Sequence, residues 1–170
     1  MTEVAPELEL VRGFNFRVKL FLSAGAAVEP PDERRVLGDG GFQECAGLEL
    51  ELDVQELQEG GRNDGVIRRI GRAKYQPIVL KRGMFSATRG NPADTAIWGW
   101  LQRLSSRNEV IRYDGVVEVL DARSAKVVAR WTFIRGLPAK VSGPQLNART
   151  GEVAIEELHI AHEGLTLELH

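Results

Sequence analysis

Three histidines lie near the C-terminal end of the sequence, at His159, His162 and His170, with Glu163 beside the second of them. Imidazole nitrogens and carboxylates are common zinc ligands, so this group is the first candidate for chemistry. Zinc-binding histidines usually follow a recognisable spacing, such as two histidines on one helical face with a glutamate between them, and the spacing here matches none of these patterns. We therefore interpret the histidines as structural or exposed residues and predict no metal site.

Covalent catalysis and phosphate binding find no better support. No serine lies in a Gly-x-Ser-x-Gly turn, and the glycine-rich stretches at residues 38–41 and 59–65 lack the Lys-Ser/Thr pair of a phosphate loop. The lone Cys45 excludes an internal disulfide framework, and a free cysteine is usually a buried apolar residue. We predict that the protein is not an enzyme and needs no cofactor.

The composition is that of a soluble globular protein of one domain. The chain has 170 residues, of which 43% are hydrophobic and 27% charged, and its apolar residues are dispersed in short stretches. The net charge of −2 gives no overall attraction to nucleic acid. The acidic start lacks the pattern of a secretory signal, and no apolar run is long enough for a membrane span. We expect the protein to be cytoplasmic before any assembly.

Alternation of apolar and polar residues predicts strands along most of the chain. The acidic segment 48–57 places Leu48, Leu50, Leu52 and Val54 on one face and Glu49, Glu51, Asp53 and Gln55 on the other. A loop insertion is predicted at about residues 24–41, which carry two prolines and a Gly-Asp-Gly-Gly sequence. The other predicted strands cover residues 13–23, 78–81, 110–120, 127–134, 152–160 and 165–169.

One helix is predicted, beginning near Asn91-Pro92 and ending near residue 106. Its apolar face is expected to contain Ile97, Trp98, Leu101 and Leu104. Trp98 and Trp131 are predicted to lie in the core, whereas Trp100 falls off this face and is a candidate contact between subunits. The predicted fold class is mainly β, with two packed antiparallel sheets in a sandwich or barrel and one flanking α-helix.

The charged segments allow two interpretations. The acidic face of residues 49–53 is either an ordinary solvated face or the wall of a channel. The basic segment 68–83 has only Tyr75 as an aromatic residue, so it lacks the stacking platforms of a single-strand nucleic-acid site. Contacts between the acidic and basic segments of neighbouring copies would account for both.

Several strings of the sequence, taken together, resemble the tail-tube protein family of contractile phage tails and phage-like contractile injection systems. They are EGG at 59–61, KYQPIVLKRG at 74–83, WGW at 98–100, WTFIRGLPAKVSGPQLNA at 131–148 and EVAIEELHIAHEGL at 152–165. The resemblance covers about residues 14–169, and its last string is the most specific.

The resemblance implies a structural subunit of an inner tube, similar to the tube protein of type VI systems, that forms stacked hexameric rings around a lumen for cargo or a tape-measure protein. Partners would be further copies of the chain and the sheath and baseplate proteins, without membrane insertion or specific nucleic-acid binding. The turn at 59–65 and the insertion at 24–41 would face neighbouring rings.

Two sets of site residues are predicted under this resemblance. Candidates for the subunit interface are Glu59, Gly60, Gly61, Arg62, Lys81, Arg82, Trp100, His162 and Glu163. Candidates for the lumen are Glu49, Glu51, Asp53 and Lys74.

Two alternative functions stay open. The insertion at 24–41 departs from the family pattern and favours a tube-initiator or baseplate subunit of the same fold. A small ligand-binding β-barrel would instead require a closed apolar pocket with a few convergent polar groups.

Overall fold

The computed structural model describes residues 11–24, 37, 41–57, 65–84, 95–107, 109–121, 123, 126–149 and 151–170. The elements in chain order are β1 (Phe16–Leu22), β2 (Glu44–Ala46), β3 (Leu50–Leu57), β4 (Ile67–Tyr75), β5 (Ile78–Gly83), α1 (Ala96–Arg107), β6 (Tyr113–Leu120), β7 (Val127–Ser142), β8 (Ile155–Ala161) and β9 (Gly164–Leu169). The predicted fold class, mainly β with antiparallel sheets and one helix, is confirmed.

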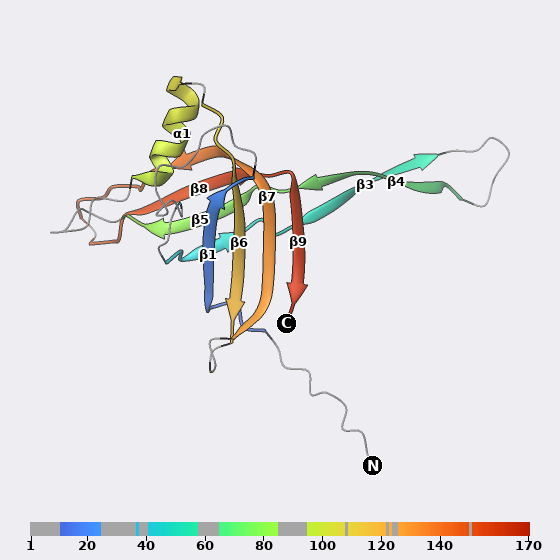
Figure 1. Cartoon of the computed structure of the whole chain (residues 1–170), viewed down its shortest axis with the longest axis horizontal. Coiled ribbons are helices and arrows are strands. Elements are labelled where there is room, and N and C mark those ends of the chain that lie inside the picture. Colours follow the sequence, from blue (N-terminus) through green and yellow to red (C-terminus); the bar gives the residue numbers. More distant parts are fainter. Residues whose placement is uncertain are drawn as a thin grey trace, which may run out of the picture.

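Two antiparallel sheets share the long strand β7. The first, here called sheet A, contains β1, β6, the first half of β7 and β9. The second, sheet B, contains the second half of β7 with β8, β5 and β2. Figure 1 shows β5 and β8 crossing the direction of β1, β6 and β9, as in orthogonally packed sheets. In the order in which the described strands are paired, β1 stands at one end and β2 at the other. These two end strands do not pair with each other, so the sheets do not close into a barrel.

Strand β7 changes sheets at Arg135 and Gly136. Arg135 has a φ of 56°, a left-handed conformation that is uncommon for a residue with a side chain. A Cβ atom on Gly136 would lie 2.7 Å from Ile160 Cγ2 and 2.8 Å from the carbonyl oxygen of Tyr113. Only glycine fits there, so the backbones of the two sheets can approach closely at this corner.

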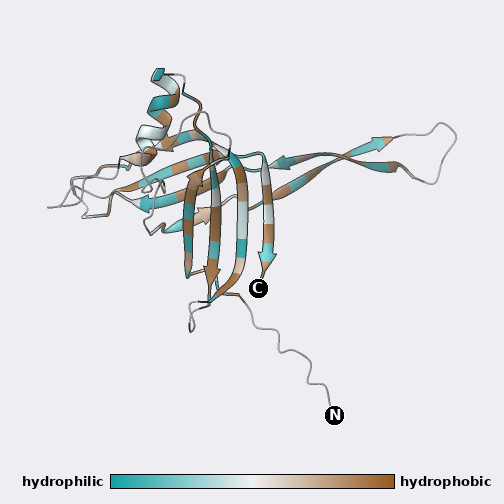
Figure 2. Ribbon diagram, in the orientation of Figure 1, coloured by the Kyte–Doolittle hydropathy of each residue, from teal (hydrophilic) through white to brown (hydrophobic). Residues whose placement is uncertain are grey.

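The hydrophobic core lies between sheet A, sheet B and α1. Leu20 and Phe133 come from sheet A, and Ile78 and Ile160 from sheet B, and all four are fully buried. Helix α1 contacts β7 and adds Ile97 and Trp100 to this core. The core side chains alternate with outward-facing ones along the strands, which Figure 2 shows as alternating colours along sheet A.

The expected role of Trp100 is wrong. Its side chain is 3% exposed, its indole N–H donates a hydrogen bond to the carbonyl oxygen of Ile111 at 2.8 Å, and its ring packs against Tyr113. Trp100 follows Ile97 by three residues, a spacing that also places two side chains on one helical face. It is therefore a core residue of its own subunit and not the exposed residue that was expected.

Strand positions also differ from the prediction. Strand β4 (Ile67–Tyr75) was not predicted, because its many basic residues hide the alternation. Strand β7 continues to Ser142 through a segment predicted to be a connection. Pro138 lies at a register shift between β7 and β8, where the missing N–H of proline is tolerated.

Strands β3 and β4 form a separate two-stranded sheet, here called the ribbon. Figure 1 shows it extending away from sheets A and B. The predicted interface residues Glu59, Gly60, Gly61 and Arg62 belong to the segment that joins these two strands, and they lie outside the described residues. Most of the predicted insertion at 24–41 and the start of the predicted helix at 91–94 also lie outside the described residues. In the part of the chain that is described, no helix is long and apolar enough to cross a membrane.

Candidate assembly surfaces

The ribbon carries an apolar face that is mostly exposed, apart from Tyr75, whose ring packs against His162. Cross-strand neighbours on this face are Leu50 with Tyr75, Leu52 with Ala73, and Val54 with Ile70. The exposed fractions are 55% for Leu50, 56% for Val54 and 74% for Ile70. Exposed apolar surface arranged in a strip is typical of a protein contact.

Charged residues of β3 and β4 pair with one another within the ribbon. Glu51 lies opposite Lys74 in the register, and the Lys74 ammonium is 3.6 Å from the Asp53 carboxylate. Closer to the tip, Arg68 binds Glu56 at 3.2 Å. The acidic and basic segments therefore meet inside one chain, and contacts between these segments of neighbouring copies stay a prediction. The lumen assignment of Glu49, Glu51, Asp53 and Lys74 stays a prediction.

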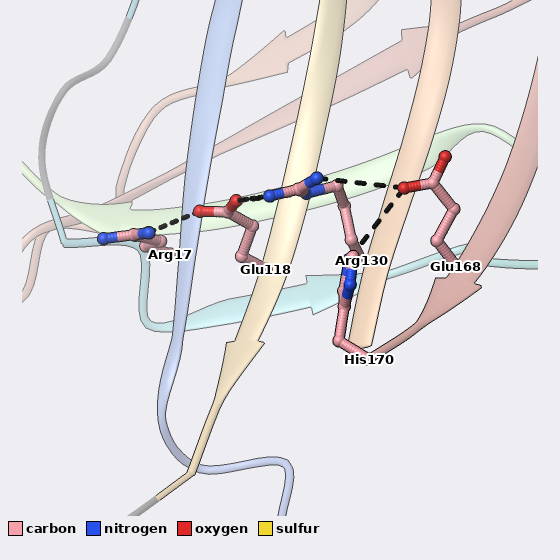
Figure 3. A network of polar contacts seen from close by, with 5 residues as sticks. All are labelled: Arg17, Glu118, Arg130, Glu168 and His170. Carbon is pink, nitrogen blue, oxygen red and sulfur yellow. Dashed lines mark hydrogen bonds and ion pairs between the residues drawn. The ribbon is translucent and has the colours of Figure 1, made fainter. Parts of the chain in front are cut away.

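A row of alternating charges crosses the outer face of sheet A, the face turned away from the core. Figure 3 shows Arg17 of β1, Glu118 of β6, Arg130 of β7 and Glu168 of β9 side by side, with His170 beside Glu168. These four residues are direct partners in the strand registers. We call them the charge ladder. Sequence analysis missed it because only the register shows that the four residues are aligned.

Contacts within the charge ladder weaken toward β9. Glu118 accepts hydrogen bonds from Arg17 Nε and, at 2.8 Å, from Arg130 Nη2, and it is only 5% exposed. Arg130 Nη1 lies 3.8 Å from Glu168, too far for a hydrogen bond, and His170 Nε2 lies 4.0 Å from the same carboxylate. Glu168 is therefore the most weakly held member of the row.

Sheet A has two edges without a described partner strand, β1 on one side and β9 on the other. On β1, the Leu20 carbonyl oxygen accepts a hydrogen bond from the Leu37 N–H. On β9, Leu167 and Leu169 lie on the core side of the sheet yet are 50% and 72% exposed. An open edge with exposed apolar residues favours pairing with another chain.

Residues 12–166 match the family model of the T4-like virus tail tube protein gp19. The chain belongs to this tail tube family. No curated protein matches the sequence.

Solved structures share the tail tube fold over nearly the whole chain. A chain from the baseplate of the anti-feeding prophage has 20% identity and a TM-score of 0.71, covering 98% of this chain and 97% of its own. One from the tube-terminating cap of the same particle has 15% identity and a TM-score of 0.72, covering 99% and 97%. One from the PVC sheath-tube complex, an extracellular contractile injection system, has 14% identity and a TM-score of 0.71, covering 95% and 93%.

In this tail tube protein, Arg82 is buried inside the subunit, contrary to its predicted place at the interface. It is 1% exposed and forms an ion pair at 2.5 Å with Glu156, which is 2% exposed. The other oxygen of Glu156 accepts a hydrogen bond from the Trp98 indole at 3.1 Å. This network ties β5 and β8 to α1, so its role is within the fold.

Three other predicted interface residues also have partners in their own chain. Lys81 contacts Glu44 at 2.9 Å, and Glu163 contacts Arg112 at 2.8 Å and Arg135 at 2.6 Å. The nitrogens of His162 lie 3.0 Å from the Gly164 carbonyl oxygen and 3.1 Å from that of Gln76. Their place in an interface stays a prediction.

Metal binding and thiol chemistry find no support among the described residues. They include no group of three or more His, Cys, Asp or Glu side chains that could hold a metal ion. Burial raises the pKa of the half-buried Cys45 thiol to about 12, so little thiolate forms at neutral pH.

Replacing Glu118 with glutamine is expected to lower the free energy of unfolding at pH 7 by about 1.5–3 kcal/mol. Burial alone would raise the pKa of Glu118, but hydrogen bonds from Arg17 and Arg130 and the charges of Arg17 and Lys19 outweigh it and hold the pKa below its ordinary value. A carboxyl with a lowered pKa stabilises the fold above about pH 4.3, and this stabilisation disappears as pH falls through the lowered pKa. Urea denaturation from pH 7 to pH 3 should show the difference between E118Q and the wild type shrinking.

The exposed Glu163 provides the control for this experiment. E163Q removes surface ion pairs to Arg112 and Arg135, and surface pairs contribute about 1 kcal/mol or less. A gap between E118Q and the wild type that stays constant down to pH 3 would show that the charge ladder contributes nothing through ionisation.

Proposed function

We propose that this protein forms rings by joining sheet A of one copy to sheet A of the next, and that stacked rings make the inner tube of a contractile phage tail or injection particle. The observation that carries the proposal is the pair of edges, β1 and β9, that have no partner strand among the described residues, on one sheet of a tail tube protein. Its strands alternate in direction, so β9 of one copy and β1 of the next would run antiparallel. A head-to-tail contact of this kind gives a ring when the rotation between neighbouring copies closes on itself.

The outer face of sheet A is suited to line the channel of such a ring. Its other face is covered by the core, sheet B and α1. These parts are bulky, and a ring has more room for them on the outside of its wall than in the channel. The outer face carries the charge ladder and Thr132 paired with Thr166, a polar surface that water or a passing polypeptide can wet. The resemblance to tail-tube proteins implies six copies in each ring, and these six sheets would form the wall around cargo or a tape-measure protein.

The ribbon supplies a second contact. Its apolar face favours a position against an adjoining copy in the same or the next ring, because burying that strip removes its exposure to water. The charged face with Glu51, Asp53 and Lys74 is then the part of the ribbon that can face solvent or the lumen. The work of the subunit is assembly instead of catalysis, with sheath and baseplate proteins as partners after folding in the cytoplasm.

Negative-stain electron microscopy of the purified full chain across a concentration series tests this function. Hollow tubes built of stacked rings are the expected result. Isolated rings that never stack would support the tube-initiator or baseplate alternative. A monomer at every concentration, alone or with baseplate proteins added, would contradict the proposal.

A further inference from the structure

The charge ladder ends in opposite charges at the two open edges of sheet A. Arg17 stands on β1 with 49% of its side chain exposed, and Glu168 stands on β9 with 59% exposed. Figure 3 shows the guanidinium of Arg17 beyond β1, on the side away from β6. Each edge therefore offers the charge that the opposite edge of another copy would attract.

Backbone hydrogen bonds fix which residues on each edge point outward. On β1, Leu20 bonds to Leu37 outside the sheet, so the even-numbered residues Phe16, Val18 and Leu20 present their N–H and C=O groups to that edge. On β9, the N–H of His170 bonds to the Val128 carbonyl oxygen, so even-numbered residues face β7 and Leu167 and Leu169 face outward. Only pairs of these outward residues can form hydrogen bonds across a seam.

Among the registers in which outward groups of β9 meet outward groups of β1, one combines free backbone groups at Leu167 and Leu169 with apolar neighbours and opposite charges. Pairing Leu167 with Val18 and Leu169 with Phe16 of the next copy matches outward groups and gives both exposed leucines apolar neighbours. The same register sets Glu168 directly opposite Arg17. A shift of two residues in one direction would bring Leu167 opposite Leu20, whose carbonyl oxygen already accepts from Leu37, and would set Glu168 opposite Lys19. In the proposed register Leu20 meets only Leu165, at the end of the seam. The other direction sets Glu168 opposite the uncharged Asn15.

We propose that Glu168 of one copy forms an ion pair with Arg17 of the next, so that the charge ladder closes into a ring of alternating charges around the channel. The inference rests on the proposed function and assigns the register of its strand seam. In this row each copy contributes two cations and two anions, so the wall carries no net charge at this level. Glu168, whose contacts with Arg130 and His170 in its own copy are 3.8 Å and 4.0 Å long, gains a partner across the seam.

Cysteine pairs across the seam test the register. Thr166 lies opposite Lys19 of the next copy, in a pair without hydrogen bonds whose Cα atoms are about 4.5 Å apart, a distance that a disulfide spans. In a Cys45→Ala background, assembled Thr166→Cys/Lys19→Cys protein should oxidise to covalent oligomers up to a closed ring. The shifted pairs Thr166→Cys/Phe21→Cys and Thr166→Cys/Arg17→Cys should remain monomeric on denaturing gels.

A charge substitution tests the ion pair itself. Glu168→Gln should raise the concentration for half-maximal assembly by about two- to fivefold, the scale of one exposed ion pair. Glu152→Gln, at another exposed carboxylate, should leave it unchanged. Urea denaturation of the unassembled subunits separates a loss of assembly from a loss of stability.

The results of these two experiments can contradict the proposed register or ion pair without contradicting the proposed tube function. Tubes that cross-link through a shifted pair, or through none of the three, would overturn the register while leaving the tube function intact. Equal assembly of Glu168→Gln and Glu152→Gln would overturn the ion pair. Failure of the unmodified chain to form rings or tubes would overturn both.

Discussion

Replacing Arg82 with alanine is expected to lower the free energy of unfolding by about 3–5 kcal/mol, because Glu156 would be left as an uncompensated buried charge. Trp98, whose indole binds the other oxygen of Glu156, would lose its fixed position, and α1 would lose its polar anchor to β8. Urea denaturation of unassembled protein, followed by tryptophan fluorescence, measures both effects.

Two further variants make this prediction specific to the unpaired charge. Arg82→Met combined with Glu156→Leu removes both charges, and it should be more stable than either single variant. Lys81→Ala, next in sequence but partly exposed, should leave the denaturation midpoint nearly unchanged. A double variant that is less stable than Arg82→Ala would show that the pair acts through packing and not through charge.

The strands that could be predicted from sequence are those with one face in the core. Strand β1, the β6–β7 hairpin and strands β8 and β9 each alternate between apolar and polar residues, as half-buried strands must. The mainly β fold followed from this pattern. The resemblance of residues 131–165 to tail tube proteins agrees with the family match over residues 12–166.

The failures have physical causes in particular residues. Strand β4 is exposed on the ribbon, so its sequence is set by charge and not by burial. The buried Arg82 looked like a surface residue because its partner Glu156 is far away in sequence. The charge ladder needed the registers of β1, β6, β7 and β9, and a one-residue slip in any of them would turn a member to the core.

The ribbon gives the second large expected effect. Replacing Leu50, Leu52 and Val54 together with threonine should weaken assembly by about a hundredfold, since each lost apolar burial costs about 1 kcal/mol or more for these half-exposed side chains. Threonine keeps a high preference for strands, so β3 should still pair with β4. Light scattering and electron microscopy across a concentration series measure the loss.

A matched triple variant on the opposite face separates the apolar strip from the ribbon as a whole. Glu49, Glu51 and Gln55 alternate with the apolar residues and point the other way, and their replacement with threonine should leave tube formation intact. Hydrogen exchange of β3 amides in the unassembled subunit should be similar in both triple variants. If the apolar variant forms tubes as readily as the charged-face variant, the ribbon is not an assembly contact. The seam between β1 and β9, where the exposed Leu167 and Leu169 lie at an edge with no described partner strand, would then have to hold the rings without the ribbon.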